Sequence, residues 1–305
     1  MDRERNEIVH VFDGPWYGPA ENAFNTINKD LSQFSHVFVD VSPLRSGFET
    51  TEAWARATAA IQQRADQHVI PENGSVYDNA FRVIVYGCQI PERLLPPSSV
   101  TVTWTFSGGI LAEMTATPWL GGTGTPVYPL IDYDRLIGLA GKVTKKTVGV
   151  FWDPYTEEPM ESVAQAVRSK LSEGRLVTMP CEMEEKKGLE ILQREWEIGF
   201  DWMYCSLCDA VVCRAGEKAY PYLLACSMAM GKPCVALSIG NPVPDFVRHA
   251  VTCLVAKDAD EAADMAKWIL SNPDKARRLG AAAQFSVASH DKDPNLLAFR
   301  KVVFG

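Results

Sequence analysis

The chain has 305 residues, 47% of them hydrophobic, and a formal net charge of −8. This length and apolar content suffice for two cores of ordinary domain size. The acidic balance argues against a nonspecific nucleic-acid binder, which needs a cationic face toward the phosphates. No run of 18 apolar residues occurs, so the sequence predicts no integral membrane association. The charged N-terminus enters a strand without a signal-peptide pattern, and we therefore expect a cytoplasmic protein.

In chain order, the first half predicts alternating strands and helices. Strands are expected at 8–13, 36–41, 82–86 and 100–106, and helices at 20–31, 50–67 and 108–117. His10 lies in the middle of the first strand with apolar residues at alternate positions, which favours a core histidine over a catalytic one.

The turn after the first strand contains Asp13, Gly14 and Gly18. Two glycines before a helix can let backbone amides approach an anionic or sugar ligand. A tight turn that binds nothing is the alternative. Asp13, at the end of the strand, is a candidate general base, or it caps the turn.

The second half predicts the same alternation. Strands are expected at 147–152, 175–181, 209–213, 234–237 and 252–256, and helices at 157–172, 184–204, 220–230, 259–270, 273–288 and 293–303. The glycines and lysines of 132–146 indicate a boundary, which gives domains 1–141 and 142–305. Alternation of this kind predicts a parallel sheet covered on both faces in each half, with a ligand cleft between the domains.

A strand–helix–strand unit around residues 208–255 is the centre of the second half. Gly231 is placed to end its helix in a left-handed conformation, and Pro233 prevents continuation. The loops that follow its two strands leave at carboxyl ends, the side on which open α/β sheets bind ligands. Further on, Asp258 and Glu261 form a capping-box pattern at the start of a helix.

The eight cysteines do not indicate a metal site. Cys205 and Cys208 are spaced as metal ligands, and Cys213 follows them. No second CxxC pair or nearby histidine completes a tetrahedral set. Free buried thiols are therefore expected.

Three motifs in order resemble one family. They are Met228-Ala-Met-Gly-Lys-Pro233 at the helix end, the segment Pro244–Asp258, and Asn272-Pro-Asp-Lys-Ala-Arg-Arg-Leu-Gly280. Together they resemble the donor-binding domain of the large retaining group of nucleotide-sugar-dependent glycosyltransferases with the GT-B fold. The resemblance implies an α/β protein of two Rossmann-like parallel-sheet domains facing a cleft, with the acceptor side in 1–141 and the donor side in 142–305. It implies transfer from a nucleotide-sugar with retention, and neither a metal nor a cofactor.

The sequence departs from this family at its paired glutamates. Alignment on Gly231 puts the first glutamate at Lys218, with Glu217 one residue early, and the second at Cys226. A thiol cannot replace a carboxylate that accepts two hydroxyl hydrogen bonds.

The resemblance and the loop positions together give the candidate site. Arg214 follows a strand and is expected to bind the diphosphate, and Glu217 or Lys218 to contact the sugar. The predicted catalytic residues are Asp13 and Glu217, and the predicted substrate-binding residues are Gly14, Gly18, Arg214, Gly216, Lys218, Gly240 and Asn241.

Two other functions fit the same residues. A GT-B-like binding or scaffold protein without activity would explain the loss of the paired glutamates. A nucleoside deoxyribosyltransferase-like enzyme also places a helix ending in Gly-Lys-Pro after a strand, but those chains are shorter and lack the closing helices. The acceptor stays open among protein, lipid, small molecule and modified nucleic acid.

Overall fold

The structure is a computed structural model and describes residues 6–12, 27–44, 55, 59, 65–86, 90–97, 101–104, 114–117, 125–126, 133–137, 139, 146–151, 160–178, 183–193, 201–215, 221–238, 243–290 and 292–304. The chain forms two compact units, unit 1 from residues 1–130 with 292–305 and unit 2 from residues 131–291. The sequence pattern places a boundary at 141/142 and keeps the C-terminus in the second domain. The observed division comes earlier, and it groups the C-terminal helix with unit 1.

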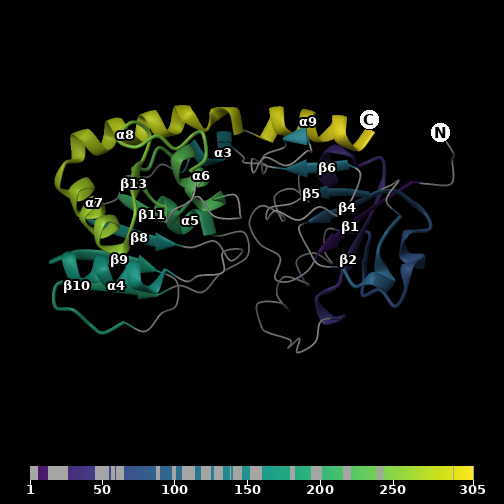
Figure 1. Ribbon diagram of the computed structural model, residues 1–305, viewed down its shortest axis with the longest axis horizontal. Helices are drawn as coiled ribbons and strands as arrows, with labels where there is room; N and C mark the ends of the chain where they lie inside the picture. Colours follow the sequence, from purple (N-terminus) through teal and green to yellow (C-terminus); the bar gives the residue numbers. More distant parts are fainter. Residues whose placement is uncertain are drawn as a thin grey trace. The chain divides into compact units, whose positions relative to one another are not determined.

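Unit 1 contains a parallel sheet with described strands in the order β3-β2-β1-β4-β5-β6-β7. Figure 1 labels β2, β1, β4, β5 and β6 of this sheet in that order. The strands are β1 (Glu7–Phe12), β2 (Ser35–Asp40), β3 (Gln67–Val69), β4 (Ala80–Tyr86), β5 (Thr101–Trp104), β6 (Met114–Thr117) and β7 (Thr125–Pro126). Valines at alternate positions of β1, β2 and β4 form a core on one face of the sheet. The residues between them are buried as well, as a parallel sheet with both faces covered requires.

The C-terminal helix α9 (Lys292–Phe304) packs on unit 1. Phe299 is fully buried, and the ring of Phe304 lies 5.8 Å from that of Phe81. Nε of Arg300 donates to Oδ2 of Asp30 over 2.6 Å. These long-range contacts explain why the last helix belongs with the first residues of the chain.

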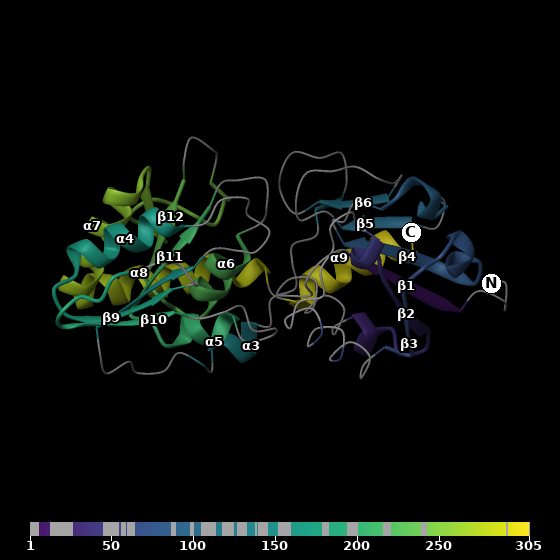
Figure 2. The same ribbon diagram turned by 90° about the horizontal axis from the view of Figure 1, so that it is seen from below.

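Unit 2 contains a parallel sheet in the order β10-β9-β8-β11-β12-β13. Its strands are β8 (Thr147–Phe151), β9 (Gly174–Thr178), β10 (Leu189–Gln193), β11 (Ala210–Arg214), β12 (Cys234–Leu237) and β13 (Leu254–Ala256). Its helices are α3 (Tyr133–Ile137), α4 (Glu161–Lys170), α5 (Asp201–Ser206), α6 (Tyr222–Ala229), α7 (Ala259–Ser271) and α8 (Pro273–Ser286). Helices α4 and α7 pack together over the core of one face, and α6 covers the other face beside α5 and α8 (Figure 2). In the described ranges, no helix combines the length and apolar content needed to cross a membrane.

The predicted end of the central helix is confirmed. Gly231 has a φ of +69°, and β12 follows at the predicted residues 234–237. Gly280 of α8 lies so close to this turn that a Cβ there would come within 2.1 Å of the Gly231 carbonyl oxygen. Asp258 caps α7 as predicted, accepting the backbone N–H of Glu261 over 2.8 Å. A capping box predicts that the Glu261 side chain accepts the backbone N–H of Asp258, but it accepts that of Lys257, one residue earlier.

The predicted helix over 184–204 is wrong. Residues 189–193 form strand β10, and a helix, α5, is described only at 201–206. Gly188 has a φ of +85°, which turns the chain into the strand. Leu189 and Ile191, two residues apart, then pack on the same core, which is the period of a strand.

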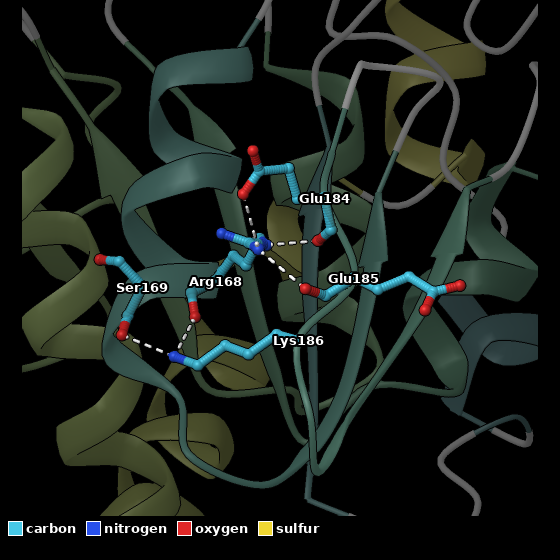
Figure 3. A network of polar contacts seen from close by, with 5 residues as sticks. All are labelled: Arg168, Ser169, Glu184, Glu185 and Lys186. Carbon is cyan, nitrogen blue, oxygen red and sulfur yellow. Dashed lines mark hydrogen bonds and ion pairs between the residues drawn. The ribbon is translucent and has the colours of Figure 1, made fainter.

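Reciprocal contacts hold the segment before β10 to the end of α4 (Figure 3). Arg168 donates from Nε to the Glu184 carbonyl over 2.6 Å and from Nη2 to the Glu185 carbonyl over 3.1 Å. Nζ of Lys186 donates to the carbonyls of Arg168 and Ser169 over 2.8 and 2.7 Å. The last carbonyls of a helix lack partners within it, so Lys186 caps α4 while Arg168 fixes the loop.

Two shorter segments also differ from the prediction. The helix expected at 108–117 is contradicted at 114–117, which form β6 and pair with β5. The helix expected at 50–67 ends before residue 67, where β3 begins and pairs with β2. Such short strands are stabilised by their neighbours in the sheet, and local periodicity does not report those neighbours.

Candidate functional site

The strand order of the unit 2 sheet reverses between β8 and β11. The chain passes from β8 to β9 and β10 on one side, and from β11 to β12 and β13 on the other. The carboxyl ends of these strands, Phe151 and Arg214, meet at this point, where Cys213 pairs with Phe151. Open α/β sheets bind ligands at the carboxyl edge where the strand order reverses. This edge of unit 2 is the candidate site.

Arg214 ends β11 opposite Leu237 of β12, and it is only 8% exposed. Burying a charged group is costly unless acceptors or anions surround it. The planar guanidinium, with five N–H donors, matches phosphate oxygens in a two-pronged geometry. Arg214 therefore stands where the sequence predicts it, at the end of the strand, and its phosphate-binding role stays a prediction.

The other predicted site residues lie outside the described residues. They are Asp13, Gly14, Gly18, Gly216, Glu217, Lys218, Gly240 and Asn241. In sequence they follow the carboxyl ends of β1, β11 and β12, which end at residues 12, 214 and 237. Their roles also stay predictions.

Sequence reasoning missed Thr178, the last residue of β9. Its side chain is fully buried, and in the part of the chain that the structure describes its hydroxyl has no hydrogen-bond partner. Thr178 pairs with Val150 of β8, so it stands on the sheet face that α4 covers. Helix α4 starts at Glu161 without a side-chain cap. A buried hydroxyl without a partner costs about 1–3 kcal/mol, so a ligand atom that pairs with it would recover that free energy.

Helix α6 follows Arg214 and is buried along its whole length. Cys226 lies in its second turn and is 1% exposed. The position aligned with the second glutamate of the family therefore faces the protein interior. The family's carboxylate would not be tolerated there without a buried partner.

The opposite, amino edge of the sheet holds Lys232 and buried thiols. Nζ of Lys232 donates to the Ser206 carbonyl over 2.6 Å, and burial lowers the pKa of this lysine. Burial raises the pKa of the Cys208 and Cys234 thiols well above the usual value, and that of Cys253 to about 12. The cysteines in the described ranges are buried and form no disulfide. Those ranges contain no group of three or more His, Cys, Asp or Glu side chains suited to a metal ion.

A shallow hollow of about 610 Å³ lies at this amino edge. Its lining residues are Lys146, Glu173, Gly174, Gly188, Leu189 and Glu190. Nζ of Lys146 lies 2.7 Å from Oε1 of Glu173, so two of its charges pair with each other on an exposed surface. Because ligands of such sheets bind at the other edge, we assign the site to the carboxyl ends.

In unit 1 the strand order reverses between β1 and β4. The rings of Phe12 and Tyr86, which end these strands, stack with centroids 4.3 Å apart and planes 10° apart. Asp40 ends the neighbouring β2, is 4% exposed, and accepts the backbone N–H of Ser42 over 2.9 Å. The described part of this edge is thus aromatic, with one carboxylate held by its own turn.

His10 of β1 is fully buried below this edge. Its Nδ1 lies 2.9 Å from the Tyr86 hydroxyl, and its Nε2 lies 2.9 Å from Nδ1 of His36. Burial lowers the pKa of His10 well below its ordinary value. The predicted core histidine, with its polar atoms satisfied, is confirmed.

Comparison with known proteins finds similarity in structure only. No protein-family model matches the sequence, and no curated protein sequence matches it. A glycosyltransferase from Rickettsia africae ESF-5 has a TM-score of 0.69 at 11% identity, over 98% of this chain and 99% of that chain. Anabaena Alr3699/HepE in complex with UDP has a TM-score of 0.68 at 12% identity, over 98% and 99%. An alpha-glucosyltransferase in complex with UDP and a 13-mer DNA containing an HMU base has a TM-score of 0.68 at 10% identity, over 99% and 100%.

These similarities extend over almost the whole chain and include both sheets. The predicted α/β class, with two Rossmann-like parallel-sheet domains of the GT-B type, is therefore confirmed. At such low identity the comparison establishes the fold, and function must be argued from the site.

Proposed function

We propose that this protein is a glycosyltransferase that binds a nucleotide-sugar at the carboxyl edge of the unit 2 sheet. The observation that carries the proposal is Arg214, a buried cation at the point where the strand order reverses. Structural neighbours that hold UDP share the fold, which supports a nucleotide-sugar donor. The acidic net charge is compatible with this assignment, because one local cation can bind a diphosphate.

Glycosyl transfer makes a specific demand on this edge. As the bond to the sugar breaks, negative charge grows on the leaving diphosphate, and fixed donors that meet this charge lower the barrier. Arg214 would supply such donors without a metal. Gly216, Lys218, Gly240 and Asn241 would contribute loop contacts, and Glu217 would contact the sugar. Retention of configuration is part of the proposal, on the strength of the sequence resemblance.

Thr178 extends the donor site toward the start of α4. Its unpaired hydroxyl can donate or accept one hydrogen bond, so it suits a polar edge of the nucleotide better than an apolar group. The first amides of α4, to which the N-cap side chain of Met160 gives no hydrogen bond, favour a partial negative charge nearby. We assign Thr178 to nucleotide binding, on β9, two strands from Arg214 on β11.

The acceptor side is assigned to unit 1, with Asp13, Gly14 and Gly18 after β1. Asp13 is the proposed general base. The DNA with an HMU base belongs to one neighbour and does not identify the acceptor of this chain. Protein, lipid, small-molecule and modified nucleic-acid acceptors should each be screened with the donor that binds.

Calorimetric titration with nucleoside diphosphates and their sugars tests the donor site. We expect one base to bind selectively, and Arg214→Ala to weaken binding roughly 10- to 150-fold, the range for a hydrogen bond to a charged group. Arg214→Lys should recover part of the loss. Arg175→Ala is the matched control, since Arg175 lies on the same sheet near the amino edge and pairs with Glu190. Equal affinity of the Arg214→Ala and wild-type proteins would refute the assignment.

A second function is favoured by one observation, the burial of Cys226 at the expected glutamate position. A protein that keeps the fold and binds the nucleotide without transferring sugar would need no carboxylate there. Product analysis after long incubation with the bound donor separates the two functions. Release of the nucleoside diphosphate, with sugar on water or on an acceptor, supports the enzyme. Tight binding with the donor recovered intact supports the binding protein.

A further inference from the structure

A chain of hydrogen bonds crosses three adjacent strands of unit 1, β4, β1 and β2. The Tyr86 hydroxyl on β4 bonds to Nδ1 of His10 on β1, and Nε2 of His10 bonds to Nδ1 of His36 on β2, each over 2.9 Å. Nε2 of His36 lies 3.1 Å from the carbonyl oxygen of Leu31. Both imidazoles are buried, with 0% and 1% exposure. The proposed sugar transfer uses none of these side chains.

The carbonyl of Leu31 determines which atom donates in each of these hydrogen bonds. A carbonyl oxygen only accepts, so Nε2 of His36 carries a proton, and in a neutral ring Nδ1 of His36 must accept. His10 then donates from Nε2, which leaves its Nδ1 to accept from the hydroxyl of Tyr86. Every donor therefore points from Tyr86 toward Leu31.

The surroundings of the two imidazoles differ. Desolvation, together with the neighbouring His36, lowers the pKa of His10 well below its ordinary value. Desolvation also lowers the pKa of His36, but the Leu31 carbonyl and the charge of Asp66 oppose that effect. Oδ2 of Asp66 accepts the backbone N–H of His36 over 2.7 Å. Of the two rings, His36 is the better place for a positive charge.

We propose that this chain of hydrogen bonds takes up one proton and that its donors and acceptors then exchange roles together, which leaves the positive charge on His36. The proton binds the Tyr86 oxygen, the former hydroxyl proton of Tyr86 passes to Nδ1 of His10, and the Nε2 proton of His10 passes to Nδ1 of His36. Three O–H or N–H bonds form and two break, which accounts for the single proton gained. His10 is again neutral, in its other tautomer, and His36 is an imidazolium still bonded to Leu31.

Reversal changes what Tyr86 offers at the edge of the sheet. Before proton uptake its hydroxyl donates to His10, and afterwards it accepts from His10, so that its own proton is available to a different acceptor. Tyr86 is the last residue of β4, where the strand order of unit 1 reverses. A proton stored beside Asp66 thus switches a hydrogen-bond donor at the end of β4. This inference stands whether or not the protein transfers sugars.

Among the charged side chains that the structure describes, Asp66 is the carboxylate that stabilises a charge on His36. The described charged side chains on β1, β2, β4, α9 and the residues just before β2 and β3 are Glu7, Lys29, Asp30, Asp40, Asp66, Arg82, Asp293, Arg300 and Lys301. Asp30 is paired with Arg300 of α9, and Asp40 accepts from its own turn at Ser42. Arg82 lies over the ring of Phe81, 4.7 Å from its centroid. The charge of Asp66 favours the protonated form of His36 directly.

Nitrogen-15 NMR of the intact chain, labelled at its five histidines, tests the proposal in the wild-type protein. Single His→Gln variants assign the signals. At pH 8 we expect both His10 and His36 to carry their proton on Nε2. On acidification, His36 should become doubly protonated and His10 should move its proton to Nδ1 at the same midpoint. The proposal is overturned if His10 keeps its proton on Nε2 while His36 titrates, or if His10 becomes the cation.

The Tyr86→Phe variant provides a second test, because it keeps the ring and removes the hydroxyl. In the reversed chain the bond from His10 to Tyr86 is linked to a cation, so its loss disfavours the charged state more than the neutral one. We expect the His36 midpoint to fall by about one pH unit. Tyr133→Phe, which removes a hydroxyl that donates to the Gln284 carbonyl in unit 2, is the matched control and should leave the midpoint unchanged. An unchanged midpoint in Tyr86→Phe would contradict the reversal.

Discussion

The described strands of the two sheets follow the same order except for the additional β7 in unit 1, and the sheets differ in what they bury where that order reverses. In unit 2 the carboxyl end of β11 is a buried arginine, and the hydroxyl of Thr178 on β9 has no hydrogen-bond partner among the described residues. In unit 1 the ends of β1 and β4 are stacked aromatic rings, and the polar atoms of His10 below them are paired. One edge therefore holds a buried guanidinium and a buried hydroxyl that a ligand could bind, whereas the described polar atoms at the other edge bond to one another. The strand order therefore determines where in each sheet a ligand site can form, and the buried polar side chains at that position determine which ligand can bind.

The largest effect should come from replacing His10, whose two ring nitrogens hydrogen-bond to neighbouring side chains in the unit 1 sheet. His10→Leu removes the hydrogen bonds that His10 makes with the Tyr86 hydroxyl and with Nδ1 of His36. Since the loss of a hydrogen-bond partner costs a buried group about 1–3 kcal/mol, unfolding in urea should show a loss of about 2–6 kcal/mol for the two groups together. His249→Leu is the control, because His249 is exposed and accepts a single backbone bond from Val255, and it should cost under about 1 kcal/mol. Equal losses of unfolding free energy in the two variants would mean that the hydrogen bonds of His10 add nothing to stability.

The next effect should come from making the unit 2 edge apolar. Arg214→Met keeps the length of the side chain and removes its charge and donors, so nucleotide affinity should fall roughly 10- to 150-fold. Calorimetry gives the affinity, and circular dichroism checks that the fold is retained. Arg175→Met, at the second residue of β9, should bind as the wild type does. If Arg214→Met and Arg175→Met bind the nucleotide with equal affinity, the conclusion that Arg214 makes the unit 2 edge a ligand site is wrong.

Acid should weaken the protein through its buried histidines. Burial holds the folded-state pKa of His10 and His36 below the ordinary 6.5, so below pH 6.5 the unfolded chain binds protons that the folded chain does not. Stability is therefore complete above pH 6.5 and falls as the pH drops, by at most about 1.4 kcal/mol per pH unit for each histidine. In unit 2, His290, whose pKa is lowered to about 4, adds a loss of the same sign between 6.5 and that value. Urea unfolding from pH 7.5 to 5 measures this, and a flat or rising stability toward acid would contradict it.

The smallest effect should come from Thr178→Val, which replaces the unpaired hydroxyl with a methyl group of the same shape. Stability should stay equal or rise by about 1 kcal/mol, because a buried group without a partner is removed. Nucleotide affinity should fall about 5-fold, as expected for one neutral hydrogen bond. Opposite signs in the two measurements identify a ligand contact. A gain in stability with unchanged affinity would leave Thr178 outside the site.

Local signals in the sequence predicted much of unit 2. The left-handed Gly231, the strand at 234–237 and the Asp258 cap each depend on a few adjacent residues, and each is confirmed. Strand β10 was missed because its period of two is short and its stability comes from pairing with β9 and from the Arg168 and Lys186 contacts. Sequence spacing alone could not distinguish Leu189 in a strand from Leu189 in a helix.

The candidate site was predictable only in part, for the same reason. Arg214 could be found because it directly follows an apolar strand. Thr178 could not, since its role depends on which face of β9 it occupies and on the absence of a partner. The hydrogen bonds of His10 reach His36, 26 positions away in the sequence, and Tyr86, 76 positions away. Only the register of β1 with β2 and β4 brings these residues together.

Hydrogen exchange measured by mass spectrometry, with and without the nucleoside diphosphate that binds best, tests the location of the donor site most directly. The predicted result is slower exchange in the peptides that contain the ends of β9 and β11 and the start of α6. Peptides from the amino-edge hollow, around Gly174 and Gly188, should exchange as before. Protection at that hollow, with none at the end of β11, would contradict the account.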